Sequence, residues 1–135
     1  MIPNTYPKSE KLKSRKSIGL LFKSGKRIYK FPFTIIFIQE NHIDSCVKFG
    51  VSVSKRNFKK ATDRNRIKRL MRECYRLNKN VLYPKIISPI SIMIIYNHNE
   101  IITYEEMEKR YKTLINSVDF SVDISDTTYV TESKL

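Results

Sequence analysis

The stretch KRNFKKATDRNRIKRLMRECYR, residues 55–76, decides how this chain is expected to fold. Its apolar residues recur at the i, i+3, i+4, i+7 spacing of one buried helical face; they are Ile67, Leu70, Met71 and Cys74. Its polar residues on the opposite face are Asn65, Lys68, Arg69, Arg72 and Arg76. A disordered basic tail would lack the apolar face. The sequence therefore predicts a helix from about Ala61 to Asn78 that packs on a core and presents a rigid cationic surface.

The charge of the whole chain is high and unevenly placed. The 135 residues carry a formal net charge of +13, and residues 1–80 contain 21 of the 26 Lys and Arg residues. Self-repulsion of this size lowers folding stability, and a polyanionic partner would relieve it. The clustering favours nucleic acid as that partner over a merely solvated basic surface.

Several classes of protein are disfavoured by the composition. The most apolar run, Ile90–Tyr96, is far shorter than the ~20 residues of a membrane helix, and the N-terminus lacks an apolar signal core. We therefore expect no membrane partner and a cytoplasmic location. Cys46 and Cys74 suit free thiols in a reducing cytosol. Together with His42 and His98 they lack metal-ligand spacing, so the protein alone is expected to bind no metal ion or other cofactor.

The remaining sequence predicts a small α+β domain. An irregular N-terminal arm, residues 1–13, precedes a helix over Ser14–Ser24 that ends at the C-cap Gly25. Strands are expected at Phe31–Gln39, Cys46–Ser54 and Ile90–Tyr96. A capping box at Thr103–Glu106 begins the last helix, which ends near Asn116, and residues 119–135 form an acidic tail that we expect to be disordered. Residues 14–118 thus form one α-β-β-α-β-α sandwich, in which the strands on either side of the basic helix are candidates for a parallel β-α-β crossover.

Two motifs resemble the signature of the protein subunit of bacterial ribonuclease P. They are Ser52-Val53-Ser54-Lys55-Arg56 and Arg64-Asn65-Arg66-Ile67-Lys68-Arg69-Leu70-Met71-Arg72. The resemblance extends from about Leu12 to Val118. It implies a ribonucleoprotein endonuclease that removes the 5′ leader from precursor tRNA, in which the RNA subunit performs the hydrolysis with bound Mg2+ and the protein has no catalytic residue. It also implies a mixed sheet, similar to the ribosomal protein S5 domain 2 fold, with a left-handed β-α-β crossover against the usual right-handed rule.

The resemblance assigns two sets of binding residues. Those that match the surface facing the RNA subunit are Ser52, Ser54, Lys55, Arg56, Arg64, Asn65, Arg66, Lys68, Arg69 and Arg72. Those that match the cleft for the leader are Ile18, Phe22, Phe33 and Ile36. Ile18 stands where the family often has an aromatic residue, and the aromatic on the strand aligns with Ile36, although a one-residue slip would give Phe37. The loop 57–63 is one residue longer than usual.

The residues themselves leave other functions open. His42 and His98 lie in predicted turns and do not form the acid–base pair of a metal-independent nuclease. Periodicity alone favours a core position for Phe22 over a base-stacking platform, and only the resemblance reverses this preference. A ribosomal or ribosome-assembly protein could use the same basic helix on structured RNA. A DNA-binding protein is disfavoured because no second helix precedes the basic helix. No obligate protein partner is implied.

Overall fold

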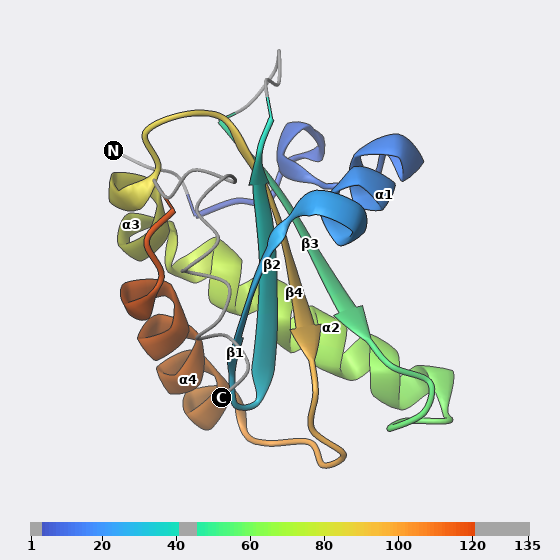
Figure 1. The fold of residues 1–135 in the computed structure, drawn as a ribbon. Coiled ribbons are helices and arrows are strands. Elements are labelled where there is room, and N and C mark those ends of the chain that lie inside the picture. Colours follow the sequence, from blue (N-terminus) through green and yellow to red (C-terminus); the bar gives the residue numbers. More distant parts are fainter. Residues whose placement is uncertain (1–3, 41–45, 121–135) are drawn as a thin grey trace.

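A single four-stranded sheet forms the centre of the fold in the computed structural model, which describes residues 4–40 and 46–120 (Figure 1). The strands lie in the order β1-β2-β4-β3 and comprise β1 Lys26–Lys30, β2 Phe33–Gln39, β3 Val47–Val53 and β4 Ile90–Tyr96. Strands β3 and β4 are parallel, whereas β1–β2 and β2–β4 are antiparallel. The predicted mixed sheet and the parallel pair are confirmed.

Helices cover both faces of this sheet. The helices are α1 Arg15–Ser24, α2 Ala61–Leu77, α3 Lys79–Leu82 and α4 Tyr104–Ser117, with short 3-10 turns η1 Lys8–Glu10 and η2 Tyr83–Lys85. Helix α1 lies on one face, and α2 and α4 lie on the other (Figure 1). In the described residues, no helix is both long and apolar enough to cross a bilayer.

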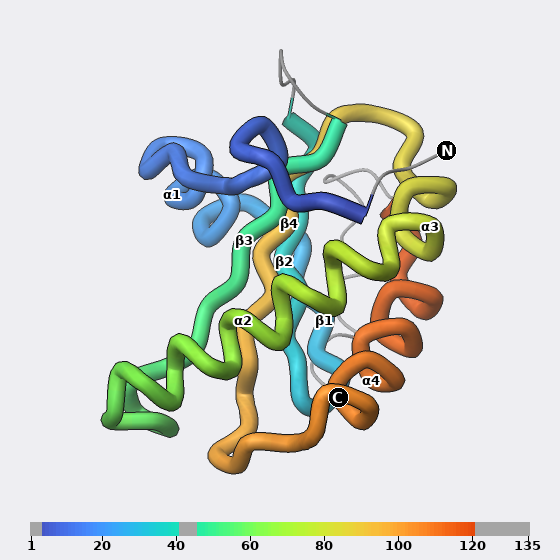
Figure 2. Tube along the Cα trace, turned by 180° about the vertical axis from the view of Figure 1, so that it is seen from behind, coloured from blue at the N-terminus to red at the C-terminus, as the bar shows by residue number. Residues whose placement is uncertain are grey.

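The connection from β3 through α2 to β4 is left-handed. Figure 2 shows α2 in front of the sheet, with β3 to the left of β4 and both strands running downward. A right-handed crossover would place β4 on the other side of β3. The handedness implied by the resemblance is therefore the one observed.

The central strands are apolar on both sides because two separate cores meet there. Ile92, Ile94 and Tyr96 of β4 belong to the larger core beneath α2 and α4. Met93 and Ile95 point the other way, into the smaller core beneath α1. The prediction that Ile90–Tyr96 is a strand covered on both faces is confirmed.

The helix boundaries follow the capping residues seen in the sequence. The Thr103 hydroxyl accepts a hydrogen bond from the Glu106 amide at 3.2 Å, which confirms the N-cap of α4. The basic helix begins at Ala61 and ends at Leu77, with Asn78 as its C-cap. Its buried residues include Tyr75, which the helical pattern did not single out.

Strand β1 was missed by the sequence analysis, which placed one strand over Phe31–Gln39. In the structure, Lys26–Lys30 pairs with β2 as a hairpin, and the longer strand begins only at Phe33. Three of the five residues of KRIYK are basic, which is common in edge strands because charge discourages further strand pairing. The element order therefore contains one strand more than predicted.

The N-terminal residues described here, 4–13, are irregular apart from η1 but are closely packed on the domain. Leu12 is buried, and its amide donates to the Phe49 carbonyl at 3.0 Å. The Tyr6 hydroxyl donates to the same carbonyl at 2.5 Å. At the other end, Phe120 is buried against Phe37, with ring centroids 5.0 Å apart. The remaining residues of the predicted acidic tail, 121–135, lie outside the described residues, as does His42.

Gly25 is required for close packing rather than for an unusual backbone conformation. Its φ is −73°, but a Cβ there would lie 2.5 Å from the Leu21 carbonyl oxygen and 2.8 Å from Cγ2 of Ile36. We expect Gly25→Ala to lower the free energy of unfolding by about 1–3 kcal/mol, measured by urea denaturation. Gly19→Ala is the matched control. It has no neighbour within 4 Å and should raise stability by about 0.5–1 kcal/mol through helix propensity. Equal effects of the two changes would contradict the packing argument.

The two thiols should differ sharply in reactivity. Cys46 is exposed and Cys74 is buried, and burial raises the pKa of the Cys74 thiol to about 12. Because the thiolate is the reactive form, a thiol reagent at pH 8 should modify one cysteine in the native protein and both in denaturant. Fast modification of both in the native state would show that the buried side of α2 is not packed on the core.

Candidate nucleic-acid interface

Helix α2 places a row of cations on the outside of the molecule. Asn65, Arg66, Arg69 and Arg72 are exposed, and Lys68 is half-buried. The opposite side of the helix is anchored by Ile67 and Met71, which are 0% and 2% exposed. Because the helix is fixed along its apolar side, the spacing of the cationic groups is also fixed. Such a surface can bind phosphates at defined positions.

Arg64 differs from the other arginines of the predicted set. Its guanidinium donates to the carbonyls of Phe58 and Lys59, at 2.8 and 3.0 Å. Phe58 is itself buried in the larger core. Arg64 therefore also fixes the loop that precedes α2, which gives it a structural role beside any contact with a phosphate.

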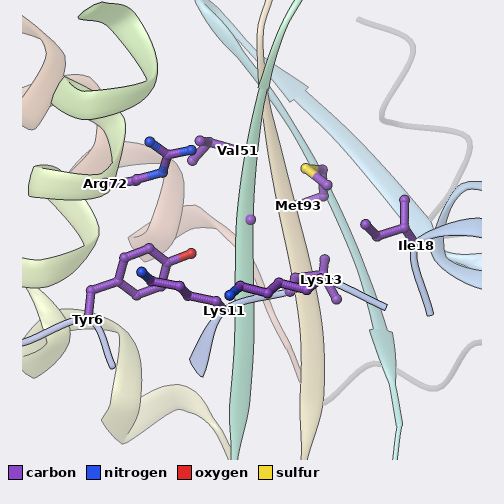
Figure 3. Close-up of a pocket in the computed structure, with 9 residues that line it drawn as sticks. Tyr6, Lys11, Lys13, Ile18, Val51, Arg72 and Met93 are labelled. Carbon is purple, nitrogen blue, oxygen red and sulfur yellow. The ribbon is translucent and has the colours of Figure 1, made fainter. Parts of the chain in front are cut away.

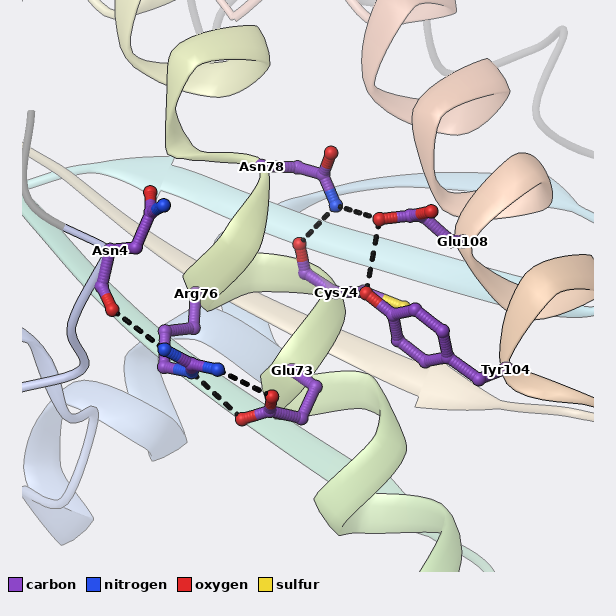
Figure 4. Close-up of polar contacts among 7 residues, drawn as sticks. All are labelled: Asn4, Glu73, Cys74, Arg76, Asn78, Tyr104 and Glu108. Carbon is purple, nitrogen blue, oxygen red and sulfur yellow. Dashed lines mark hydrogen bonds and ion pairs between the residues drawn. The ribbon is translucent and has the colours of Figure 1, made fainter.

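The charges of the central part of α2 are not neutralised by neighbouring acids. Within residues 4–40 and 46–120, no carboxylate forms an ion pair with Arg66, Lys68, Arg69 or Arg72. Arg76, one turn further, differs: it binds Glu73 through two hydrogen bonds of 2.7 and 2.8 Å and also donates to the Asn4 carbonyl (Figure 4). The hydrogen bond from Arg76 is also the main reason that the pKa of the Glu73 carboxyl is lowered. The cationic surface thus ends before Arg76.

The C-terminal end of α2 is instead tied to α4. The Asn78 amide donates to the Cys74 carbonyl at 2.8 Å and to Glu108 at 3.0 Å, and the Tyr104 hydroxyl donates to the same carboxylate (Figure 4). The hydrogen bond from Asn78 is the largest cause of the lowered pKa of Glu108. These contacts are structural, because they hold α2 and α4 together on the same face of the sheet.

The predicted serines occupy two different environments. Ser54 directly follows β3, and its hydroxyl accepts a hydrogen bond from the Arg56 amide at 3.0 Å, which shapes the turn that presents Lys55 and Arg56 to solvent. Ser52 pairs with Ile95 in the sheet and lies on the face that carries α1, opposite to α2. Ser52 is therefore not part of the α2 surface, although it lies close to the loop that leads into it.

The four predicted cleft residues are not brought together as one surface. Phe22 is 40% exposed at the end of α1, and Ile18 is half-buried on the same helix. Ile36 lies on the α1 face but is 0% exposed, because α1 covers it. Phe33 is 1% exposed in the larger core on the opposite face, so its assignment to the cleft is wrong.

A pocket of about 450 Å3 lies across the outer edge of β3, where the N-terminal arm bridges to the strand between Lys11 and Phe49, and it joins the two faces (Figure 3). Arg72 of α2 lies on one side of it and Ile18 of α1 on the other, while Lys11 and Lys13 of the N-terminal arm cross in front of the strand. Tyr6 also lines the pocket, and burial raises its pKa to about 12 against the opposing effect of the Arg72 charge. These arm residues have no role predicted from the sequence, because nothing in a polar, irregular segment indicates where it packs.

The described residues offer no obvious place for a metal ion. They contain no group of three or more His, Cys, Asp or Glu side chains that could hold one. The prediction that the protein alone binds no metal stays a prediction.

A small mixed sheet with a left-handed β-α-β crossover and one exposed row of cations defines a class of basic α+β proteins suited to a polyanionic partner. The family model for Ribonuclease P matches residues 6–119, and the chain belongs to that family. Among curated relatives, the Ribonuclease P protein component of Porphyromonas gingivalis is 41% identical over 76 residues, which is 56% of this chain and 56% of that protein. The component from Thermotoga maritima is 38% identical over 78 residues, 58% of this chain and 64% of that protein. The aligned part thus spans little more than half of the relatives' length.

Solved structures share the fold over a longer range. The RNase P protein from Thermotoga maritima aligns with a TM-score of 0.66 and 26% identity, covering 81% of this chain and 97% of that one. The RNase P protein of Staphylococcus aureus aligns with a TM-score of 0.65 and 23% identity, covering 82% and 97%. The likeness to the second structure concerns the fold alone.

Proposed function

We propose that this protein is the protein subunit of ribonuclease P and that it promotes removal of the 5′ leader from precursor tRNA. Membership of the family supports this proposal. The single observation that carries it is the position of Asn65, Arg66, Arg69 and Arg72, which are exposed together on a helix anchored by its apolar side. The partners are the RNA subunit and precursor tRNA, and the complex works in the cytoplasm.

In this proposal the polypeptide binds and orients RNA and leaves bond cleavage to the RNA subunit. The surface of α2 binds phosphates of the RNA subunit, with the loop residues Lys55 and Arg56 at its edge. The Mg2+ ions that support hydrolysis are held by the RNA subunit, since the cationic surface of α2 offers no carboxylates that would bind them. Neutralising phosphates near those ions lowers the repulsion between two RNAs, which strengthens the binding of substrate.

Reconstitution tests this function directly. The protein is added to a bacterial ribonuclease P RNA and a precursor tRNA at low Mg2+, and cleavage at the leader junction is followed on a gel. We expect clear stimulation over the RNA alone, and stimulation that declines as salt is raised. Absence of any stimulation would favour the alternative, a ribosomal or ribosome-assembly protein that uses the same helix on another structured RNA.

A further inference from the structure

The N-terminal arm carries three lysines, Lys8, Lys11 and Lys13, that lie outside the cationic surface of α2. We call them the arm lysines. Lys8 and Lys13 are exposed, and Lys11 is half-buried. Within residues 4–40 and 46–120, no carboxylate forms an ion pair with any of the three. Like charges this close together repel one another, and a bound polyanion would relieve the repulsion.

The arm is held on the domain by residues that are interspersed with these lysines. The Tyr6 hydroxyl and the Leu12 amide both donate to the Phe49 carbonyl, at 2.5 and 3.0 Å. Between them in the sequence, the Glu10 carboxylate lies 2.6 Å from a buried ammonium of α3. The Lys11 ammonium is itself positioned, because it lies 5.3 Å from the centre of the Tyr6 ring. The arm lysines therefore lie at fixed places on the surface, as a site for spaced phosphates requires.

These lysines continue the cationic surface of α2 across the outer edge of β3. Figure 2 shows the arm, in dark blue, running from beside the C-terminal part of α2 across β3 to α1. The pocket of about 450 Å3 brings Arg72 of α2 together with Lys11 and Lys13 of the arm (Figure 3). A second hollow of about 210 Å3 adjoins it, because Lys11 and Lys13 line both, and Lys8 and Lys48 also line the second. Cations thus follow one another from α2 to the start of α1.

We propose that the arm lysines bind phosphates of the RNA subunit and form one continuous interface with Arg69 and Arg72. The proposal rests on the function proposed above and adds a second element of the chain to the same interface. Lysine binds a phosphate as a compact point charge. Because Arg72 lines the same pocket as Lys11 and Lys13, an RNA backbone bound on α2 can continue onto the arm without leaving the protein.

Removing two of these charges tests the interface. Lys11→Gln with Lys13→Gln keeps most of each side chain and removes the ammonium groups. We expect this double variant to raise the Kd for the RNA subunit at least about tenfold, and to lower the slope of log K against log salt by about two, since each phosphate contact releases about one counterion. Filter binding over a range of salt concentrations measures both quantities.

Two further double variants are the controls. Lys109→Gln with Lys112→Gln removes the same charge from exposed positions on α4 and should bind within about threefold of the wild type. Lys11→Arg with Lys13→Arg keeps the charges and should bind as the wild type does. Equal losses from the arm and from α4 would overturn the proposal, and so would an equal loss in the arginine variant.

Chemical footprinting gives a second and direct readout. The free protein and its complex with the RNA subunit are acetylated under the same conditions, and the modification of each lysine is measured by mass spectrometry. We expect the RNA subunit to protect Lys11 and Lys13 and to leave Lys109 and Lys112 as reactive as in the free protein. Protection of all four lysines alike, or of neither arm lysine, would overturn the proposal.

Substrate binding by the assembled enzyme separates the RNA subunit from precursor tRNA as the partner. At protein concentrations that saturate the RNA subunit, the Kd for precursor tRNA should be the same with Lys11→Gln and Lys13→Gln as with the wild type. If the double variant binds the RNA subunit normally and loses affinity for precursor tRNA, the arm lysines face the substrate, and the proposal is wrong while the proposed function stands. If the wild-type protein neither binds the RNA subunit nor stimulates cleavage, the proposed function fails and this interface with it.

Discussion

Replacing Arg69 and Arg72 together by alanine is expected to weaken binding to the RNA subunit about 100-fold. Both side chains are exposed on α2, and no carboxylate of the described residues pairs with them. A hydrogen bond that involves a charged group contributes about 1.5–3 kcal/mol, so losing two amounts to roughly 3 kcal/mol or more. Each lost phosphate contact should also lower the slope of log K against log salt by about one. Filter binding over a range of salt concentrations measures both quantities.

A second double variant separates a specific surface from net charge. Lys109→Ala with Arg110→Ala removes the same two charges from α4, where both side chains are exposed. Both residues lie on α4, so the change leaves the α2 surface untouched. Arg110 forms an ion pair of 2.7 Å with Glu106. We expect binding within about threefold of wild type for this control. Equal losses in the two double variants would mean that the RNA responds to overall charge and that α2 has been misassigned.

Glu10→Ala is expected to lower the free energy of unfolding by about 3 kcal/mol. The Glu10 carboxylate lies 2.6 Å from the Lys79 ammonium and accepts a hydrogen bond of 2.5 Å from the Tyr75 hydroxyl. The Lys79 side chain is 1% exposed, and its ammonium lies 5.4 and 5.7 Å from the rings of Tyr75 and Tyr83. Removing the carboxylate leaves a buried positive charge without its partner, which is among the most destabilising single changes. Urea denaturation measures the loss.

Two further variants make this second prediction specific. Glu106→Ala breaks a surface ion pair whose side chains are 40–45% exposed, and it should change stability by less than about 1 kcal/mol. Lys79→Met removes the buried charge, so adding it to Glu10→Ala should restore much of the lost stability. A stable Glu10→Ala protein, or a double variant no more stable than the single, would show that the N-terminal arm does not neutralise Lys79.

Each part of the fold that the sequence predicted correctly depends on a local sequence signal. Thr103 and Gly25 mark helix ends through local contacts that lie within a few residues. The cationic and apolar sides of α2 follow from a helical period that holds over 17 residues. Such local signals predict structure well, because they depend on residues close in the sequence and not on how distant segments pack.

The errors concern which face of the sheet a side chain points to and which strand lies at its edge. Local sequence signals determine neither. In FTIIFIQ six of the seven residues are apolar or bear a methyl group, and β2 is buried on both sides. Periodicity therefore cannot tell which side chains point toward α1. It could not correct the match to the family that assigned Phe33 to the cleft, although Phe33 lies in the other core. Strand β1 was missed because its charges suit an edge and resemble a loop. Within KRIYK, only Ile28 and Tyr29 are residue types that favour a strand.

The parallel pairing of β3 with β4 has a mechanical consequence. Strand β3 leads directly into the turn before α2, and β4 beside it is almost fully buried. The turn that carries Lys55 and Arg56 is thus attached to a stiff pair of strands, and thermal motion changes its position little. Under the function proposed above, an RNA that binds there would meet a surface already formed, and little conformational entropy of the protein would be lost on binding.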